Sequence, residues 1–433
     1  MNTTPWKLGI VCKSWRDIFW STPQLWTSVT INTSRVSEQG YTEFVQRWLF
    51  RSGGLPLFLT LGEGDYPRQR YIPEESAVET ALYAILNESS PRWSRLNVCV
   101  SDQQLKYLSK FPSCLPSLLD LHFKRFSRSK KALVFGGHMK PSPSKIAIRG
   151  VKFQDIGIAW DHVTHVEAAK FQVADCLETF RQAKQMTHFT VHSFRNADPS
   201  SELFPEAIVH QRLQVLNIRT KYDAQNGLLD SLTLPSLQDL CCSGQITKAS
   251  LITRSGCKIT RLDLRKSFSQ PTDFEIQLLD LLERLPSVTH LTLDYPAISN
   301  AFFERLSSST APSAGVEAGK MVEFLPDLCS FHMCCTLRFQ WECLADILPS
   351  HPGLFELTSE NPRRALQSLR LQIVQEDETD SDDDSTWRFR SIPDHVIMRL
   401  LEVRAGGLEI SIMNDCRRDL LRISTHSNQA NVG

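Results

Sequence analysis

LPSVTHLTL, residues 285–293, contains the pattern that decides the fold. Its apolar positions are Val288, Leu291 and Leu293, and the last three residues alternate as in a half-buried β-strand. Just upstream, residues 272–282 begin with the helix-capping box TDFE and continue with apolar residues at helical spacing. We therefore expect a helix and then a strand here. The apolar face of the helix is expected to comprise Ile276, Leu278, Leu279, Leu281 and Leu282.

The same apolar-x-x-apolar-x-apolar pattern recurs along most of the chain. The middle residues of its copies, with those at Ile146 and Val166 the weakest, are Leu96, Leu121, Ile146, Val166, Phe189, Leu216, Leu240, Leu262, Leu291, Phe331 and Leu369. Successive copies lie 20–29 residues apart up to Leu291, and the last two steps are 40 and 38 residues. One strand and one helix per unit of this length is typical of a leucine-rich-repeat solenoid, in which each unit buries its apolar strand face against its neighbours.

The expected fold class is therefore α/β, a horseshoe-like leucine-rich-repeat solenoid with a small helical segment at the N-terminus. The alternative is an ordinary α/β domain of alternating strands and helices, which the number of copies at similar spacing disfavours. The expected organisation is a helical segment at 1–30, a linking helix and strand region at 31–92, and irregular repeats at 93–433. A helix closed by a glycine pair is expected from Asp394 to Gly407.

Composition excludes several classes of protein. The 433 residues include 48 Lys and Arg against 48 Asp and Glu, so an excess of positive charge cannot drive nucleic-acid binding. No run approaches the roughly 18 apolar residues of a membrane span, and the N-terminus has no signal-peptide pattern. We expect a soluble protein of the cytoplasm or nucleus that binds neither nucleic acid nor membrane, with its 12 cysteines reduced.

The N-terminal segment is rich in tryptophan and predicts one amphipathic helix. Apolar residues at steps of three and four form a stripe that comprises Leu8, Val11, Cys12, Trp15, Ile18 and Phe19. Pro23 is expected to end this helix. In purely structural terms, the stripe would cover the open end of the core.

The same residues resemble the second half of an F-box, as found in F-box proteins of mushroom-forming fungi. The matching phrases are VCKSWRDI at 11–18 and STPQLWTSV at 21–29, followed by a helix and strand segment that starts FVQRWLFRSGGLPL at 44–57. The direct match covers about the first 60 residues. A full F-box begins with a Leu-Pro-x-Glu segment and another helix, whereas only seven residues precede Leu8 here.

The resemblance implies a substrate-recognition subunit of a Skp–cullin–F-box (SCF) ubiquitin ligase. On the matched positions, Leu8, Val11, Cys12 and Trp15 would lie on the helix that faces the Skp-type adaptor. Leu25 and Trp26 would join that helix to the repeats, whose concave face would bind an unidentified protein substrate. The alternative is a leucine-rich-repeat interaction scaffold that has lost the adaptor link, which the missing first helix favours.

Enzymatic chemistry is not expected, and neither is a cofactor or a bound metal. The sequence has no Gly-x-Ser-x-Gly, no His-Glu-x-x-His and no dinucleotide fingerprint. Neighbouring cysteines on a strand, such as Cys334 and Cys335, would point to opposite faces and could not converge on one zinc ion. The histidines expected to be polar surface residues are His162, His165, His188, His192 and His210.

Charged residues define the candidate substrate contacts. A basic stretch at 121–150 has eight Lys and Arg without Asp or Glu, and we expect either a solvated loop or a contact for an acidic or phosphorylated substrate. An acidic run at 376–384 includes Thr379 and Ser381 as candidate kinase sites. The candidate substrate-binding residues, from the basic stretch and from positions between the strand leucines, are Lys124, Arg125, Arg128, Arg219, Asp239, Asp263, Thr292 and Arg370.

Overall fold

The computed structural model describes thirteen segments of the chain. They are residues 10–62, 77–100, 118–125, 140–195, 207–219, 225–243, 249–265, 274–294, 298–308, 324–348, 366–374, 392–414 and 417–423. Arg128 and the acidic run at 376–384 lie outside these segments. No helix within them is long and apolar enough to cross a membrane.

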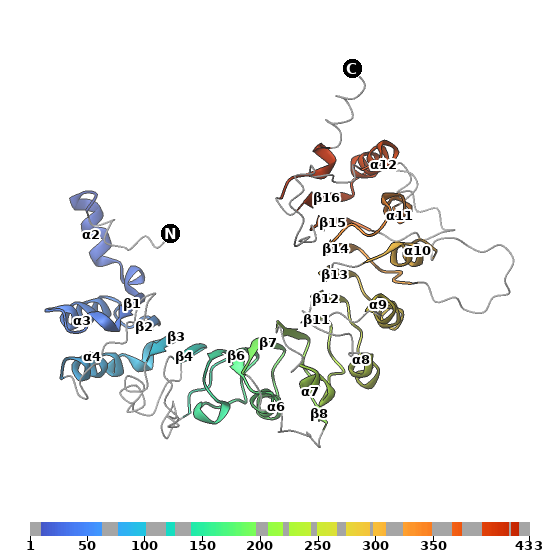
Figure 1. Cartoon of the computed structure of the whole chain (residues 1–433). Helices are drawn as coiled ribbons and strands as arrows, with labels where there is room; N and C mark the ends of the chain where they lie inside the picture. Colours follow the sequence, from blue (N-terminus) through green and yellow to red (C-terminus); the bar gives the residue numbers. More distant parts are fainter. Residues whose placement is uncertain are drawn as a thin grey trace, which may run out of the picture. The chain divides into compact units, whose positions relative to one another are not determined.

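The chain forms two compact α/β units, unit 1 at Met1–Leu213 and unit 2 at Gln214–Gly433. In each unit seven described strands form a parallel sheet in chain order. The boundaries expected at 30/31 and 92/93 both fall inside unit 1. The described helices lie along one face of each set of strands, and none of them lies on the other face (Figure 1).

Unit 1 alternates strands with helices and short 3-10 turns. Its strands are β1 (Ser28–Asn32), β2 (Leu57–Gly62), β3 (Trp93–Val100), β4 (Asp120–Arg125), β5 (Lys145–Arg149), β6 (His165–Phe171), β7 (His188–Phe194) and the short β8 (Ile208–Val209). Its α-helices are α2 (Lys13–Ser21), α3 (Tyr41–Arg51), α4 (Ala77–Glu88) and α6 (Val173–Gln182). The 3-10 turns are η1 (Pro23–Trp26), η2 (Thr33–Arg35), η3 (Ser90–Arg92) and η4 (Phe153–Asp155).

Burial alternates along these strands as the sequence pattern predicts. In β5, Ile146 and Ile148 are each 2% exposed, whereas Lys145 and Arg149 are exposed. The weak repeat copies at Ile146 and Val166 are therefore confirmed as strands, and so are the clear copies in β3, β4 and β7. β1 had not been expected, although Val29 and Ile31 alternate with polar residues there.

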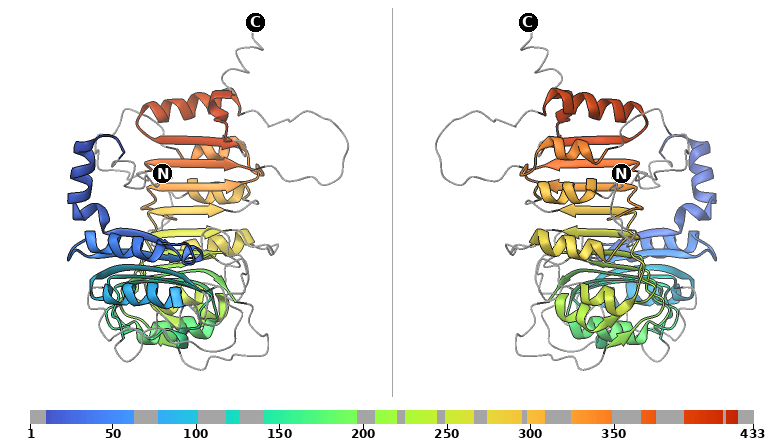
Figure 2. Two further views of the ribbon diagram at one scale, coloured as in Figure 1. Left: turned by 90° about the vertical axis from the view of Figure 1, so that its left-hand side faces the viewer. Right: turned by 90° about the vertical axis from the view of Figure 1, so that its right-hand side faces the viewer.

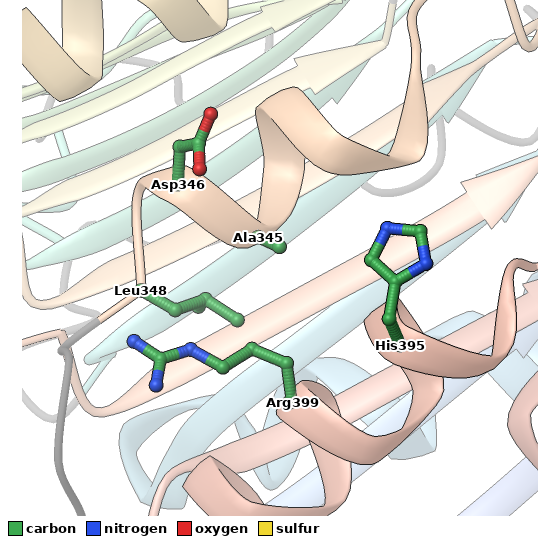
Figure 3. A pocket seen from close by; sticks show the side chains of 5 residues that line it. All are labelled: Ala345, Asp346, Leu348, His395 and Arg399. Carbon is green, nitrogen blue, oxygen red and sulfur yellow. The ribbon is translucent and has the colours of Figure 1, made fainter.

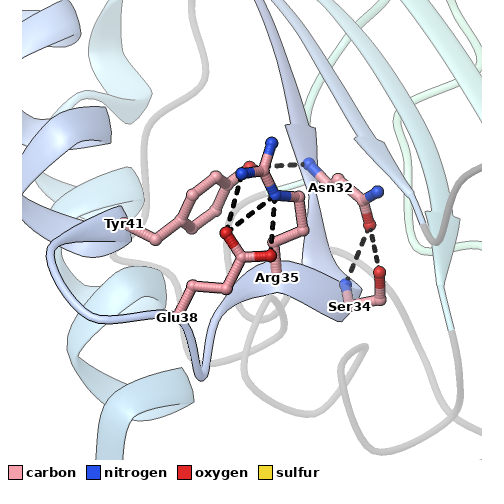
Figure 4. Close-up of polar contacts among 5 residues, drawn as sticks. All are labelled: Asn32, Ser34, Arg35, Glu38 and Tyr41. Carbon is pink, nitrogen blue, oxygen red and sulfur yellow. Dashed lines mark hydrogen bonds and ion pairs between the residues drawn. The ribbon is translucent and has the colours of Figure 1, made fainter.

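A polar turn leads from β1 to α3 (Figure 4). Asn32 Oδ1 accepts hydrogen bonds from the Ser34 backbone N–H at 3.0 Å and from Ser34 Oγ at 2.7 Å. Tyr41 Oη accepts the Asn32 backbone N–H at 2.9 Å, and burial raises the pKa of this phenol. Arg35 forms a two-nitrogen contact with the Glu38 carboxylate, with Nη2 at 2.7 Å. These bonds satisfy the backbone where the chain leaves the strand.

Unit 2 repeats the same plan. Its strands are β9 (Val215–Ile218), β10 (Leu232–Thr233), β11 (Asp239–Ser243), β12 (Arg261–Arg265), β13 (His290–Asp294), β14 (Ser330–Cys335), β15 (Ser368–Ile373) and β16 (Glu409–Asn414). Its helices are α7 (Gln225–Asp230), α8 (Ala249–Ser255), α9 (Phe274–Glu283), α10 (Asn300–Ser308), α11 (Trp341–Asp346) and α12 (Asp394–Ala405). Figure 2 shows the yellow-to-red strands of this unit side by side in chain order.

β13, which contains Leu291 and Leu293, is buried on one face as expected. Leu291 is 1% exposed and Leu293 is fully buried, and both lie in register with apolar residues of β12 and β14. The expected helix ahead of it exists as α9, but Ile276 is 72% exposed and does not belong to its buried face. Phe274 is buried in that face instead. The helix expected from Asp394 to the glycine pair is confirmed as α12.

Candidate interaction surfaces

Helix α2 begins later than its apolar spacing predicts. Cys12 precedes the helix with an extended backbone (φ −160°, ψ 174°), and Val11 lies in the turn before it. The expectation that Val11 and Cys12 lie on the helix is therefore wrong, since the backbone becomes helical only from Lys13. Leu8 lies outside the described residues. Pro23 follows the helix end at Ser21, as predicted.

Most of the apolar stripe on α2 is exposed. Val11 is 66% exposed, Trp15 50% and Ile18 58%, whereas Phe19 is 2% exposed. Cys12 is exposed as well. The structural expectation that this stripe covers the open end of the core is therefore wrong for every described member except Phe19. Large apolar side chains gathered on one surface mark sites of protein–protein contact. We call Val11, Trp15 and Ile18 the α2 apolar surface.

Trp26 attaches α2 to the body of unit 1. Its side chain is 2% exposed and lies 4.5 Å from the Phe19 ring and 4.9 Å from the Trp48 ring, measured between centroids. Its Nε1–H donates to the Phe19 carbonyl oxygen at 3.1 Å, and its own carbonyl oxygen accepts the Trp48 Nε1–H at 2.9 Å. Through these contacts Trp26, one of the two residues expected at a junction, connects α2 with α3. Leu25, the other expected junction residue, is half-buried in the same turn.

A cation–π contact holds the C-terminal end of α2. The Arg51 guanidinium lies 3.6 Å from the centroid of Trp20 and 4.8 Å from that of Trp26. The two indoles stack at 5.2 Å, and burial lowers the pKa of Arg51. An arginine over two tryptophan faces fixes the direction of α2 without covering its apolar surface.

The helix-free face of unit 1, the unit-1 strand face, presents three rows of side chains in register. The first row is Ser28, Phe58, Arg95, Asp120, Lys145, His165 and His188. The second is Thr30, Thr60, Asn97, His122, Ala147, Glu167 and Thr190, and the third is Asn32, Gly62, Cys99, Lys124, Arg149, Ala169 and Ser193. Lys124 is thus placed on this face beside Arg149. Arg125 ends β4 at the alternate position, and the structure does not describe its side chain.

Two histidines on this face form a stacked pair. The rings of His165 and His188 lie 4.2 Å apart with an angle of 11° between their planes. Thr164 Oγ1 donates to the Ser144 carbonyl oxygen at 3.0 Å and accepts from His165 Nδ1 at 2.8 Å, because its single hydroxyl proton is already used. Thr187 and His188 repeat this arrangement, with Oγ1 2.9 Å from Nδ1. The recurring Thr-His dipeptide is the sequence signal that could have revealed this pair.

We expect His165 to titrate below the ordinary histidine pKa. Burial lowers its pKa most, followed by the charges of His188 and Lys145, while Asp120 opposes them. Replacing His188 by glutamine should therefore raise the His165 pKa, measured by NMR titration of the imidazole. His192→Gln is the matched control, because His192 is exposed on the same strand and pairs with Glu167 at 2.6 Å. A His165 pKa above about 6.5 in the unaltered chain would contradict this assignment.

The helix-free face of unit 2, the unit-2 strand face, carries most of the remaining candidate residues. Its central row in register is Asn217, Cys241, Asp263, Thr292, His332, Arg370 and Ser411. Asp239 belongs to the adjacent row, and Arg219 follows the end of β9, where its Nε donates to Asn217 Oδ1 at 3.1 Å. The structure therefore brings Asp263, Thr292 and Arg370 into one row and leaves Asp239 and Arg219 beside it.

Arginines on the unit-2 strand face are matched by carboxylates. Arg265 Nη2 lies 2.8 Å from Asp263 Oδ2, and Arg370 Nη2 lies 2.6 Å from Glu409 Oε1. The Asp263 side chain raises the pKa of Arg265, and the Arg370 side chain lowers the pKa of Glu409. A further arginine, Arg261, lies 3.9 Å from Asp239. This face is therefore close to electrically balanced.

Cysteines on these strands alternate between the faces, as predicted. Cys335 is buried and Cys334 is half-buried, and the neighbouring pair Cys242 and Cys241 behaves in the same way. Burial raises the pKa of both Cys335 and Cys241 to about 12, so these thiols stay protonated at neutral pH. Within the described segments no group of three or more potential metal ligands converges.

His210 corrects the expectation for the histidines. It is 4% exposed, and its Nε2 lies 3.1 Å from the Ala183 carbonyl oxygen. Burial lowers the pKa of this imidazole, so it is a core residue in the neutral form. His162 and His192 are exposed as expected, whereas His165 and His188 are half-buried.

A shallow depression lies between α11 and α12 of unit 2 (Figure 3). Its volume is about 360 Å³, and it is lined by Ala345, Asp346, Leu348, His395 and Arg399. The depression is open to solvent and follows the groove between two neighbouring helices. His395 Nε2 lies 3.5 Å from Glu342 Oε1 on α11, so it links the two helices. We assign this groove to helix packing.

Known proteins give no direct guide to these surfaces. No protein-family model and no curated protein matches the chain. The function therefore has to be argued from the α2 apolar surface and the two strand faces.

Proposed function

We propose that this chain is the substrate-recognition subunit of an SCF-type ubiquitin ligase. In this proposal the F-box-like segment binds a Skp-type adaptor, and a leucine-rich-repeat solenoid binds the protein substrate through the strand faces. The chain acts by holding two proteins together and carries out no catalysis itself. This role would place it in the cytoplasm or nucleus.

The α2 apolar surface is the observation that carries the proposal. Val11, Trp15 and Ile18 are half or more exposed, although the segment behind them is anchored by Trp26 and Arg51. A firmly held helix end with uncovered tryptophan and isoleucine is suited to bind an apolar groove of another protein. These residues also belong to the phrase that resembles an F-box.

The order of the strands supports the repeat part of the proposal. Within each unit the seven strands of the large sheet, which excludes β8 and β10, pair in parallel with their neighbours in chain order. Repeat architectures place each unit against its sequence neighbours in this way. The connections also differ greatly in length while the registers of Leu262, Leu291 and Phe331 are kept.

Three of the cysteines lack the properties of a nucleophile. A cysteine nucleophile requires a lowered thiol pKa, because the thiolate is the form that reacts. Burial instead raises the pKa of Cys176, Cys241 and Cys335. These cysteines therefore serve as core and strand residues in the proposed receptor.

Co-purification with the Skp-type adaptor tests the proposal. We expect the unaltered chain to retain the adaptor, and the double variant Trp15→Asp/Ile18→Asp to lose at least about tenfold in affinity, because two apolar anchors become charged. Ile276→Asp is the matched control, since Ile276 is 72% exposed on α9, and it should bind as the unaltered chain does. Circular dichroism should show the same secondary structure for all three.

Two results would count against this function. The first is an unaltered chain that fails to retain the adaptor, and the second is a double variant that binds as well as the control. Either result would favour the rival proposal, a repeat scaffold without an adaptor link.

A further inference from the structure

The unit-1 strand face has an excess of positive charge at β4 and β5. Four basic side chains stand in its three rows, Arg95, Lys124, Lys145 and Arg149, against the two acidic side chains Asp120 and Glu167. Both acidic groups are already engaged. Arg95 Nη2 lies 2.7 Å from Asp120 Oδ2, and His192 Nε2 lies 2.6 Å from Glu167 Oε1.

Lys145 and Arg149 form no such ion pair among the described residues, although Asp120, which pairs with Arg95, is the register neighbour of Lys145. Within the described residues neither of them has a carboxylate at ion-pair distance, and both are exposed on β5. Arg149 is also the direct register neighbour of Lys124, so two like charges stand side by side on adjacent strands. Like charges placed opposite each other in a sheet lower its stability. Lys124 has a contact of its own, so the charges open to an acidic partner are those of Lys145 and Arg149.

Small side chains surround the paired charges. Cys99 is the register neighbour of Lys124 on β3, and Ala169 is that of Arg149 on β6. Ala147 lies between Lys145 and Arg149 along β5. Bulkier side chains lie nearby as well, since His122 and Glu167 are the register neighbours of Ala147 and His165 is that of Lys145.

The spacing of the charges favours carboxylates over phosphate. Phosphate sites in proteins use several donors that converge on one point, often as arginine forks. Here Lys124 and Arg149 stand on strands about 4.8 Å apart, and Lys145 lies about 13 Å from Arg149 along β5. The separation of Lys145 from Arg149 therefore decides the choice, because a ligand that contacts both needs separate acidic groups, as in a series of Asp and Glu side chains.

The two strand faces differ in how many of their basic side chains are paired with carboxylates. On the unit-2 strand face Arg261, Arg265 and Arg370 each lie within 4 Å of a carboxylate, so that face has little charge left for a partner. We propose that the unit-1 strand face, around Lys124, Lys145 and Arg149, binds an acidic, carboxylate-rich segment of a partner protein. This inference rests on the proposed function only in naming that partner as the ligase substrate.

Fluorescence anisotropy with labelled peptides tests the inference on the full chain. The probe is a fluorescein-labelled octamer of glutamate, and the comparison peptides are an octamer of glutamine and a phosphoserine peptide of equal net charge. At about 150 mM salt, where unspecific attraction is screened, we expect the glutamate peptide to bind more tightly than both. Lys145→Glu/Arg149→Glu should weaken its binding at least about tenfold, because two attractions become repulsions.

A matched charge reversal serves as the control. Lys152 and Lys184 are exposed lysines of unit 1 that lie outside the strand rows, and Lys152→Glu/Lys184→Glu should change the affinity less than about twofold. Equal loss in both double variants would overturn the assignment to this face. Tighter binding of the phosphoserine peptide, or of a DNA oligonucleotide of equal charge, would overturn the choice of ligand.

The adaptor experiment separates this inference from the proposed function. A chain that binds the glutamate peptide but not the adaptor would keep the acidic-segment site and refute the ligase role. A chain that binds the adaptor but not the glutamate peptide would keep the ligase role and refute the acidic-segment site.

Discussion

Replacing Trp26 by alanine is expected to lower the free energy of unfolding of unit 1 by about 3–5 kcal/mol. The indole is 2% exposed and packs against the rings of Phe19 and Trp48. Its loss leaves a cavity at the junction of α2, η1 and α3 and removes the hydrogen bond to the Phe19 carbonyl oxygen. Guanidinium unfolding followed by circular dichroism measures the change, and hydrogen exchange should rise at residues 13–51.

Trp15→Ala provides the comparison for this prediction. Trp15 is 50% exposed, so its removal should change the free energy of unfolding by less than about 0.5 kcal/mol. A similar loss of stability in both variants would mean that α2 is not attached through Trp26.

Replacing Leu291 by alanine is expected to lower the free energy of unfolding of unit 2 by about 2–5 kcal/mol. Leu291 is 1% exposed and lies in register between Leu262 and Phe331 on the neighbouring strands. Truncation would leave a cavity in the middle of the apolar layer. Thermal and chemical unfolding of the variant measure the effect.

Thr292→Ala is the matched substitution one residue further along β13. Thr292 lies on the unit-2 strand face, in register with Asp263 and His332. We expect this change to cost less than about 0.5 kcal/mol. Comparable losses at Leu291 and Thr292 would be inconsistent with a strand that is covered on one face only.

The strands were predictable because each of them is covered on one face. Leu291 and Leu293 alternate with polar residues, and this alternation follows directly from one buried and one exposed face. β16 was missed because the position three residues before Ile410 is Gly407, where the clear copies have an apolar side chain. β1 was missed for a different reason, because its first residues were interpreted as part of the F-box-like phrase at 21–29.

Helix surfaces were less predictable than strands. Apolar spacing shows that a helix has an apolar face, but it does not show whether anything covers that face. On α2 the spacing correctly groups Trp15, Ile18 and Phe19, yet only Phe19 is buried. On α9 the apolar residues extend around the helix, and packing buries Phe274 instead of Ile276.

The candidate binding residues were partly recoverable from the sequence. Asp263 and Arg370 were expected between strand leucines, and their common row follows from the parallel register. The ion pair of Arg370 with Glu409 could not be foreseen, because it depends on β16, which had no recognised pattern. Lys145 and Arg149 were visible only as members of a basic stretch until the strand placed them on one face.

The parallel register of the strands determines at which positions the binding specificity of the proposed receptor could change. Each strand contributes side chains to the helix-free face at fixed positions, whereas its alternate positions form the core. In the proposed receptor, recognition would diverge one strand at a time, by substitutions at positions such as Asp263, Thr292 and Arg370. A library that varies only these positions should yield chains that fold alike and select different partners.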